Sequence, residues 1–314
     1  MHPAFSVIFL TTLIGVGQGF FTALVLGQVY SLTSPSFATE NQFFTVGAII
    51  VLLFLGGGLI ASFFHLGHPE RAWRAASQWR TSWLSREVIT LPLFMFFVFI
   101  YAVAQYNSAN VSTTLLIGLL GIISSFLLFY CTGMVYACLP FLREWATPLT
   151  VVNFILFGCA SGFALAGYYA SIYQTEFVSV FTQFAIAFTI LSCLTRIWVL
   201  RRNSALKPKT TTQSAIGVYS KNVKQRSQGQ MGGSYNTREF THGKSIIFIK
   251  QIKTIFMVFA FILPLIFLFF GLQSESSFLL LIAFLTQYAG LIAERWHFFA
   301  QVNHPQNIYY QTIS

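Results

Sequence analysis

Residues 43–65 read FFTVGAIIVLLFLGGGLIASFFH, a run without Lys, Arg, Asp or Glu that ends on a histidine. At a rise of 1.5 Å per residue, about 20 apolar residues carry a helix across the ~30 Å hydrocarbon core of a bilayer. The run therefore predicts a membrane-spanning helix. Further apolar runs of similar length predict spans at about 5–32, 87–106, 112–136, 147–173, 177–200, 252–272 and 277–298.

The composition favours the same architecture. Of the 314 residues, 8% are charged and 55% are hydrophobic, whereas a soluble domain normally has about 25% charged residues. The solvent for most of the chain is therefore the lipid bilayer. We predict an all-α, polytopic membrane protein, with eight transmembrane helices in a bundle that forms one integral membrane domain over residues 1–314.

The start of the chain and its basic residues predict an orientation. The opening Met1-His2-Pro3-Ala4 lacks the basic region and cleavage site of a secretory signal, so the first span is expected to be retained. With an even number of spans, all 18 Lys and Arg residues fall at one end of the predicted bundle. The opposite connections carry Glu40, Glu176 and Glu275 and no Lys or Arg. The positive-inside rule assigns the basic end, and both termini, to the cytoplasm.

The net charge of +10 follows from this topology and from attraction to anionic lipid headgroups. A nucleic-acid partner is not needed to explain it. Residues 203–245 form the one long polar stretch, without helical periodicity. This stretch predicts a flexible, basic cytoplasmic loop or a segment that binds a partner.

Polar and small residues within the spans have ordinary packing explanations. Glycines recur in 15–19 and 56–58, where they allow helices to approach closely in a bilayer. Gln18 and Gln28 need hydrogen-bond partners at membrane depth, and a neighbouring helix can supply them.

The chain offers no clear set of metal ligands. Its cysteines lie in apolar runs without C-x-x-C spacing, at 131, 138, 159 and 193, so neither zinc nor an iron–sulphur cluster is indicated. A membrane haem needs paired axial histidines, for which His65 and His297 are the candidates near spans. We expect no haem and no metal in this chain.

The candidate site is the connection between the second and third spans. His65 closes the second predicted span and Glu87 opens the third, so an antiparallel hairpin returns both to the same membrane boundary. A base and an acid there suit quinone chemistry, because a quinol releases two protons together with its two electrons. The alternatives are a helix-end histidine bonded to backbone, and a first-turn glutamate favoured by the helix dipole or paired with Arg86.

Arginines and tryptophans alternate along the same connection. Trp73 lies among them, and interfacial tryptophans are typical of such a segment. The residues predicted to dock a soluble partner are Arg71, Arg74, Trp79, Arg80, Trp83 and Arg86. The arginines have an alternative role in setting the topology.

Three stretches carry a resemblance to a known family. They are MHPAFSVIFLTTLIGVGQG at 1–19, HLGHPERAWRAASQWRTSWLSREV at 65–88 and AERWHFFAQVNHPQNIYY at 293–310. Together they resemble the membrane anchor subunit of dimethyl-sulphoxide-reductase-type molybdoenzymes over essentially the whole chain. His68 departs from the pattern, because an arginine is expected there.

The resemblance implies a functional assembly in a bacterial inner membrane. Such an anchor has eight helices and no haem. It exchanges electrons between a quinone, menaquinone or ubiquinone, and an iron–sulphur subunit that is wired to a molybdopterin catalytic subunit. The family places its quinol site at the residues that match His65 and Glu87.

The basic, cytoplasmic side of the His65–Glu87 connection favours a cytoplasm-facing complex of the sulphite dehydrogenase type. The alternative within the family is an outward-facing dimethyl sulphoxide reductase anchor that oxidises menaquinol. Outside it, the alternatives are a purely structural anchor and a secondary transporter, which would want ionisable groups near the bilayer midplane.

Overall fold

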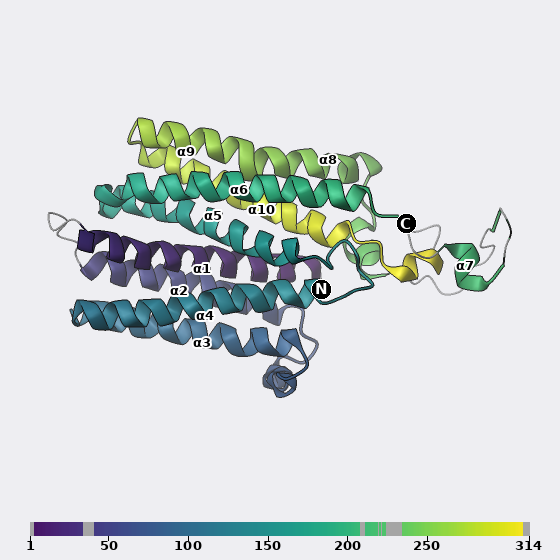
Figure 1. The fold of residues 1–314 in the computed structure, drawn as a ribbon, viewed down its shortest axis with the longest axis horizontal. Helices are drawn as coiled ribbons and strands as arrows, with labels where there is room; N and C mark the ends of the chain where they lie inside the picture. The colour runs from purple at the N-terminus through teal and green to yellow at the C-terminus, as the bar shows by residue number, and fades with distance from the viewer. Residues whose placement is uncertain are drawn as a thin grey trace.

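The computed structural model describes residues 3–33, 41–207, 211–218, 220, 222–223 and 234–309. Eight helical segments in these ranges are long and apolar enough to cross a membrane, and no strand occurs in them. Figure 1 shows them aligned side by side in an elongated bundle. The predicted fold class is therefore confirmed. Glu40, Lys209, Lys221, Lys224 and Arg226 lie outside the described residues.

Most of the helices begin and end within four residues of the predicted runs, and the largest difference is at Ile246, six residues before the predicted start at 252. The spans are α1 Pro3–Thr33, α2 Asn41–Phe63, α3 Trp83–Tyr106, α4 Val111–Ala137, α5 Pro148–Tyr173, α6 Val178–Ser204, the compound segment α8 Ile246–Met257, η4 Val258–Ile262 and α9 Leu263–Gln273, and α10 Ser277–Ala300. The shorter elements are η1 Pro69–Gln78, η2 Thr175–Phe177, α7 Thr212–Ile216, η3 Asn236–Thr241 and η5 Pro305–Tyr309.

Helices α1 and α5 form the middle of the bundle. α1 packs on α2 and α5, the α3–α4 pair lies on one side, and α6 and α9 lie on the other (Figure 1). A Cβ atom at Gly162 would come within 2.3 Å of the carbonyl carbon of Gly19. Glycine is therefore required where α1 crosses α5. Small residues at such crossings let membrane helices approach each other closely.

The two glutamines inside α1 are bonded to neighbouring helices, as predicted. Gln18 donates from Nε2 to the backbone oxygen of Ser125, at 2.6 Å. Gln28 donates to Thr114 Oγ1 at 2.6 Å and accepts from the Tyr101 hydroxyl at 2.8 Å. These bonds join α1 to α3 and α4, so neither side chain needs a ligand.

The polar stretch 203–245 contains a packed segment at its end. Phe240 is buried, and its ring lies 5.5 Å from that of Phe299 and 6.0 Å from that of Trp296. The Asn236 side chain donates to the backbone oxygen of Val302. The described residues Ser234–Thr241 are thus held against α10 and the segment that follows it, rather than forming part of a free linker.

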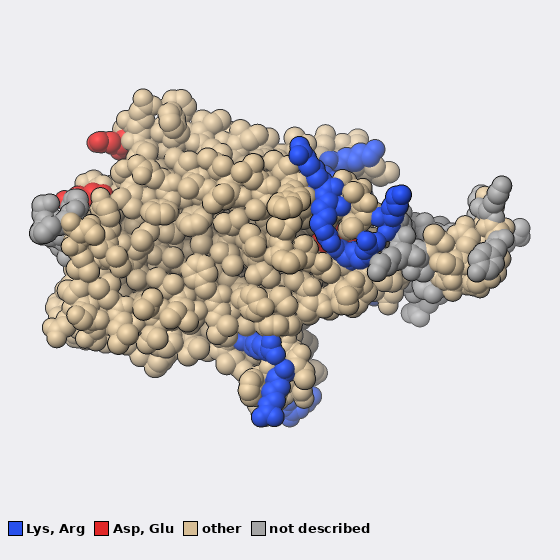
Figure 2. Space-filling view, viewed as in Figure 1, with Lys and Arg blue, Asp and Glu red and all other residues tan. Residues whose placement is uncertain are grey.

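The charged side chains that are visible on the surface in Figure 2 lie near the two ends of the bundle. Figure 2 shows Lys and Arg near one end of the visible face and acidic residues at the other. The first and last spans begin and end at the basic end (Figure 1), as an even number of spans requires. The assignment of that end to the cytoplasm stays a prediction.

Candidate functional site

Glu87 lies inside α3 rather than at its start. Ser82 caps the helix, because its Oγ accepts a hydrogen bond from the Ser85 amide at 3.4 Å. The helix therefore begins at Trp83, four residues before the predicted span, and Glu87 falls in its second turn. There Thr132 Oγ1 of α4 donates to Glu87 Oε1 at 2.7 Å. The carboxyl group is partly buried and faces the bundle.

A narrow internal cavity of about 20 Å³ lies beside Glu87. This volume holds about one or two water molecules, and is too small for a quinone ring. Five spans contribute to its walls. Its lining residues are Thr11, Thr12, Ile14, Gly15, Gln18, Glu87, Phe129, Thr132, Phe154, Phe157, Gly158, Leu291 and Arg295.

His65 lies two residues beyond α2, which ends at Phe63, and is therefore outside the span that it was expected to close. The side chain is partly buried, and burial lowers the pKa of its imidazole below the ordinary value of 6.5. Its Nδ1 atom is buried without a hydrogen-bond partner in the described part of the chain. The alternative interpretation, a ring bonded to the backbone, is thus not supported among the described residues, and the imidazole keeps a buried polar atom without a partner.

A larger apolar groove of about 450 Å³ lies between the start of α1 and the end of α2. It falls within the volume range of small-molecule sites. Its lining residues are Phe5, Ser6, Phe9, Leu13, Gly57, Ile60, Ala61 and Phe64, the residue before His65.

The structure does not bring His65 and Glu87 into one cavity. The groove that ends at Phe64 is lined by Phe9 and Leu13 of α1, whereas the cavity of Glu87 is lined by Thr11 and Gly15. Residues two apart on an α-helix are about 200° apart around its axis. α1 therefore stands between the groove and the cavity. The role of both residues in quinone binding stays a prediction.

Two of the predicted docking residues act within the chain. Arg86 Nε donates to the Trp79 backbone oxygen at 2.9 Å, and its Nη2 donates to the Arg80 oxygen at the same distance. The guanidinium carbon lies 4.1 Å from the centre of the Trp83 ring. Arg86 and Trp83 therefore brace the turn between η1 and α3.

The other predicted docking residues are exposed. Trp73 and Trp79 pair with the guanidinium groups of Arg74 and Arg80 at 5.5 and 5.4 Å. Arg71 contacts Glu70, which is also exposed, at 3.7 Å. Helix η1 projects from the side of the bundle next to α3 (Figure 1), so these side chains are available to a partner.

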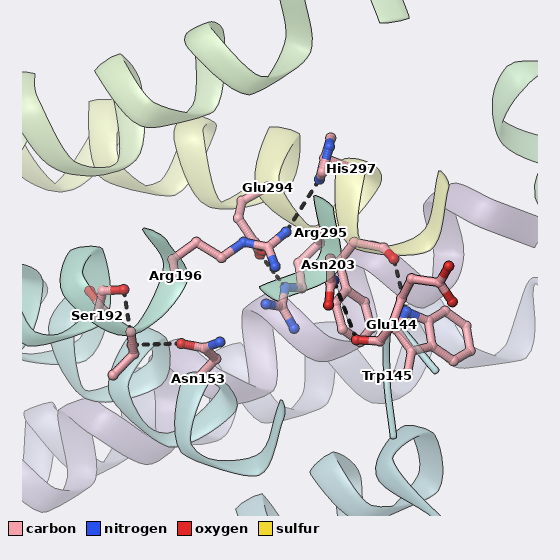
Figure 3. Close-up of polar contacts among 11 residues, drawn as sticks. Glu144, Trp145, Asn153, Ser192, Arg196, Asn203, Glu294, Arg295 and His297 are labelled. Atoms are coloured by element: carbon pink, nitrogen blue, oxygen red, sulfur yellow. Dashed lines mark hydrogen bonds and ion pairs between the residues drawn. The ribbon is translucent and has the colours of Figure 1, made fainter. Parts of the chain in front are cut away.

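The sequence interpretation missed a buried charge cluster, formed by Arg196 of α6 and Glu294, Arg295 and His297 of α10 (Figure 3). Glu294 has no exposed surface. Its Oε1 lies 2.8 Å from Arg196 Nε, and its Oε2 accepts from Arg295 Nε at 2.6 Å. Arg196 Nη2 lies 3.3 Å from the His297 ring. The available signal was Glu294 itself, an acidic residue inside a predicted span.

Among the described residues, no three His, Cys, Asp or Glu side chains gather as a metal site. His297 is engaged by Arg196, and its ring also packs 5.3 Å from Phe256. The expectation of no haem and no metal stays a prediction.

Comparison with known proteins agrees with the resemblance seen in the sequence. The family model described as DMSO reductase anchor subunit (DmsC) matches residues 1–310. The chain is also 49% identical over 325 residues to a sulfite dehydrogenase subunit of Allochromatium vinosum, and the match covers 100% of both chains. With eight membrane-spanning helices and a family match over nearly its full length, this chain belongs to the DMSO reductase anchor subunit (DmsC) family.

Proposed function

We propose that this chain is the anchor of a membrane-bound molybdopterin oxidoreductase and exchanges electrons between a quinone and a docked iron–sulphur subunit. Family membership supports the anchor role. The observation that carries the quinone role is Glu87, a partly buried carboxyl group of the candidate span α3 that accepts from Thr132 and lines an internal cavity. A buried ionisable group in a membrane span usually has a functional reason.

The two candidate residues suit different parts of the reaction. A quinone exchanges two electrons and two protons when it is interconverted with its quinol. The apolar groove that ends at Phe64 has the room for a ring, and the adjacent His65 is a neutral imidazole with a free nitrogen. The Glu87 cavity has room only for water, so Glu87 serves to hold or pass a proton.

A sulphite-oxidising complex is the form that we favour. The full-length relative is named as a subunit of a sulfite dehydrogenase, and the basic end of the bundle predicts a cytoplasmic site. In this assignment electrons flow from sulphite through the catalytic and iron–sulphur subunits to menaquinone or ubiquinone in a bacterial inner membrane. An outward-facing dimethyl sulphoxide reductase anchor would have the opposite orientation.

We further propose that the partner subunit docks at the basic end. Exposed side chains of η1 and the following turn, Arg71, Arg74, Trp79 and Arg80, offer charge and aromatic surface there. Arg86 and Trp83 contribute by holding this segment in place.

The test is sulphite-dependent quinone reduction by the purified complex with Glu87→Gln or His65→Ala. We expect either variant to lower quinone reduction by roughly 10²-fold or more, as loss of an acid–base group does. Sulphite oxidation with a soluble artificial electron acceptor should stay at the wild-type rate. Glu176→Gln, at an exposed glutamate, is the matched control.

Wild-type quinone reduction by the Glu87→Gln, His65→Ala double variant would indicate a purely structural anchor. Loss of both activities together would point to failed assembly and is checked by co-purification of the partner subunits.

A further inference from the structure

The cavity beside Glu87 has charged side chains on two of its walls. Glu87 comes from α3 and Arg295 from α10, and both line the same 20 Å³ space. Between them the walls are aromatic and weakly polar, with Phe154 and Phe157 of α5 and the Gln18 amide of α1. Opposite charges that line one small cavity with such walls are screened less than charges in water.

Arg295 is fixed, but part of its guanidinium group is unsatisfied. Its Nε donates to Glu294 Oε2 at 2.6 Å, and its guanidinium carbon lies 4.3 Å from the Phe154 ring centre and 4.7 Å from that of Phe298. The residue is 3% exposed. Its Nη1 atom is buried and has no hydrogen-bond partner in the described part of the chain. A buried cationic donor of this kind needs an acceptor.

The charge balance points to the same acceptor. In the buried charge cluster, Glu294 is shared by two arginines, because Arg196 Nε lies 2.8 Å from its other oxygen. Two guanidinium groups and one carboxylate leave an excess positive charge inside the bundle. An ionised Glu87 would supply a negative charge at the cavity that Arg295 also lines.

Other titratable groups near Glu87 do not replace Arg295 in this role. Arg86, on the same helix, donates its hydrogen bonds to the backbone oxygens of Trp79 and Arg80. Cys131 and Tyr136 of α4 lie within electrostatic range of Glu87, but neither supplies a positive charge. The cavity-lining residues of α1 and α5 are not titratable.

We propose that Arg295 is a positioning residue for Glu87, whose guanidinium group keeps the carboxyl group ionised across the cavity and ready to accept a proton. Glu294 holds Arg295 in this role by accepting from its Nε, which leaves the Nη1 donor without a partner in the described part of the chain. The inference rests on the proposed function for the use of the proton, but the pairing itself is a property of this chain alone.

The test is infrared titration of the full-length chain in detergent, without quinone. The protonated-carboxyl signal of Glu87 is identified by its loss in Glu87→Gln and followed against pH in the other variants. In Arg295→Gln we expect the pH midpoint of that signal to rise by about one to three units, because an opposite charge nearby has been removed. Arg295→Lys restores the charge and should return the midpoint most of the way to wild type.

Arg196→Gln is the matched control. It removes the same charge from the other oxygen of Glu294, but Arg196 does not line the cavity. Its midpoint shift should be less than half that of Arg295→Gln. A wild-type midpoint in Arg295→Gln, or equal shifts in the two variants, would overturn the proposal.

If Arg295→Gln does not yield folded protein, the yield of folded protein is measured for the double variant Glu87→Gln, Arg295→Gln and tests the pairing instead. Recovery of folded protein supports the pairing, because both opposed charges are then removed, and an equally poor yield overturns it. Failure of the proposed function would look different, since Glu87→Gln would then keep full quinone reduction whatever the infrared midpoints are.

Discussion

At the residue scale, Glu294 joins the two buried arginines of the charge cluster. Both of its oxygens are used, one by Arg196 and one by Arg295, and all three side chains are at most 4% exposed. Glu294→Gln would leave two unneutralised cations beside each other in the bundle. We expect a loss of about 3–5 kcal/mol in the free energy of unfolding, as for other broken buried pairs.

The measurement is the thermal midpoint of the purified chain in detergent. Glu176→Gln, at an exposed glutamate of η2, should change stability by no more than about 0.5 kcal/mol. Equal midpoints for Glu294→Gln and Glu176→Gln would mean that the cluster does not stabilise the bundle.

His65 predicts a pH dependence of stability. Because burial lowers the pKa of His65 below 6.5, the unfolded chain binds the proton more tightly than the folded chain does. The contribution of a neutral His65 is therefore full above the unfolded value and is lost as the pH falls below it. We expect the thermal midpoint to decrease between about pH 7.5 and 5.5, and to decrease less in His65→Asn.

Burial also lowers the pKa of His304, which makes His304→Asn the comparison variant. His65 follows α2 and His304 follows α10, so the two histidines lie in separate segments and their effects on the pH slope should add. A pH slope in His65→Asn equal to that of the wild type would show that His65 protonation is not linked to folding.

The residues of the charge cluster also show what the sequence leaves open. The sequence pattern places Arg196 and Arg295 among the basic residues of a membrane boundary, because long side chains near span ends usually reach the headgroups. The structure turns both inward onto Glu294. Residues 196 and 294 are far apart in sequence, and no periodicity within a single span reveals that α6 and α10 bring them together.

At the element scale, hydrophobic length predicted the spans well because an apolar run of about 20 residues has no stable alternative to a helix in a bilayer. Boundaries set by local chemistry were less accurate. The cap at Ser82 starts α3 early enough to move Glu87 inside the helix. The π-helical stretch Val258–Ile262 was also not predicted. It packs closely on α10, where a Cβ atom at Gly290 would come within 2.1 Å of the Ala260 nitrogen.

The small residues of the spans give an element-scale prediction. A Cβ atom at Gly162 would collide with the α1 backbone at Gly19, whereas one at Gly56 of α2 would meet nothing within 4 Å. Gly162→Ala should therefore force α1 and α5 apart and lower the thermal midpoint clearly. Gly56→Ala should be neutral, or stabilising by about 0.5–1 kcal/mol through its helix propensity.

Thermal unfolding of the two variants in the same detergent makes the comparison. The substitution is identical in both, so a difference between them reports the helix crossing. If Gly162→Ala were as stable as Gly56→Ala, the close contact of α1 with α5 would not exist in solution.

At the scale of the whole molecule, every proposal that involves the cytoplasm depends on which end of the bundle faces it. Gln78 of η1 is exposed at the basic end, and Asn110 is exposed before α4 at the opposite end. In a chain with the exposed Cys138 replaced by Ser, we expect a membrane-impermeant maleimide to label Asn110→Cys in intact cells. Gln78→Cys should react only after the cells are broken, because basic connections stay inside. The reverse pattern would place the groove near His65 on the outer side and favour an outward-facing reductase over a cytoplasmic sulphite dehydrogenase.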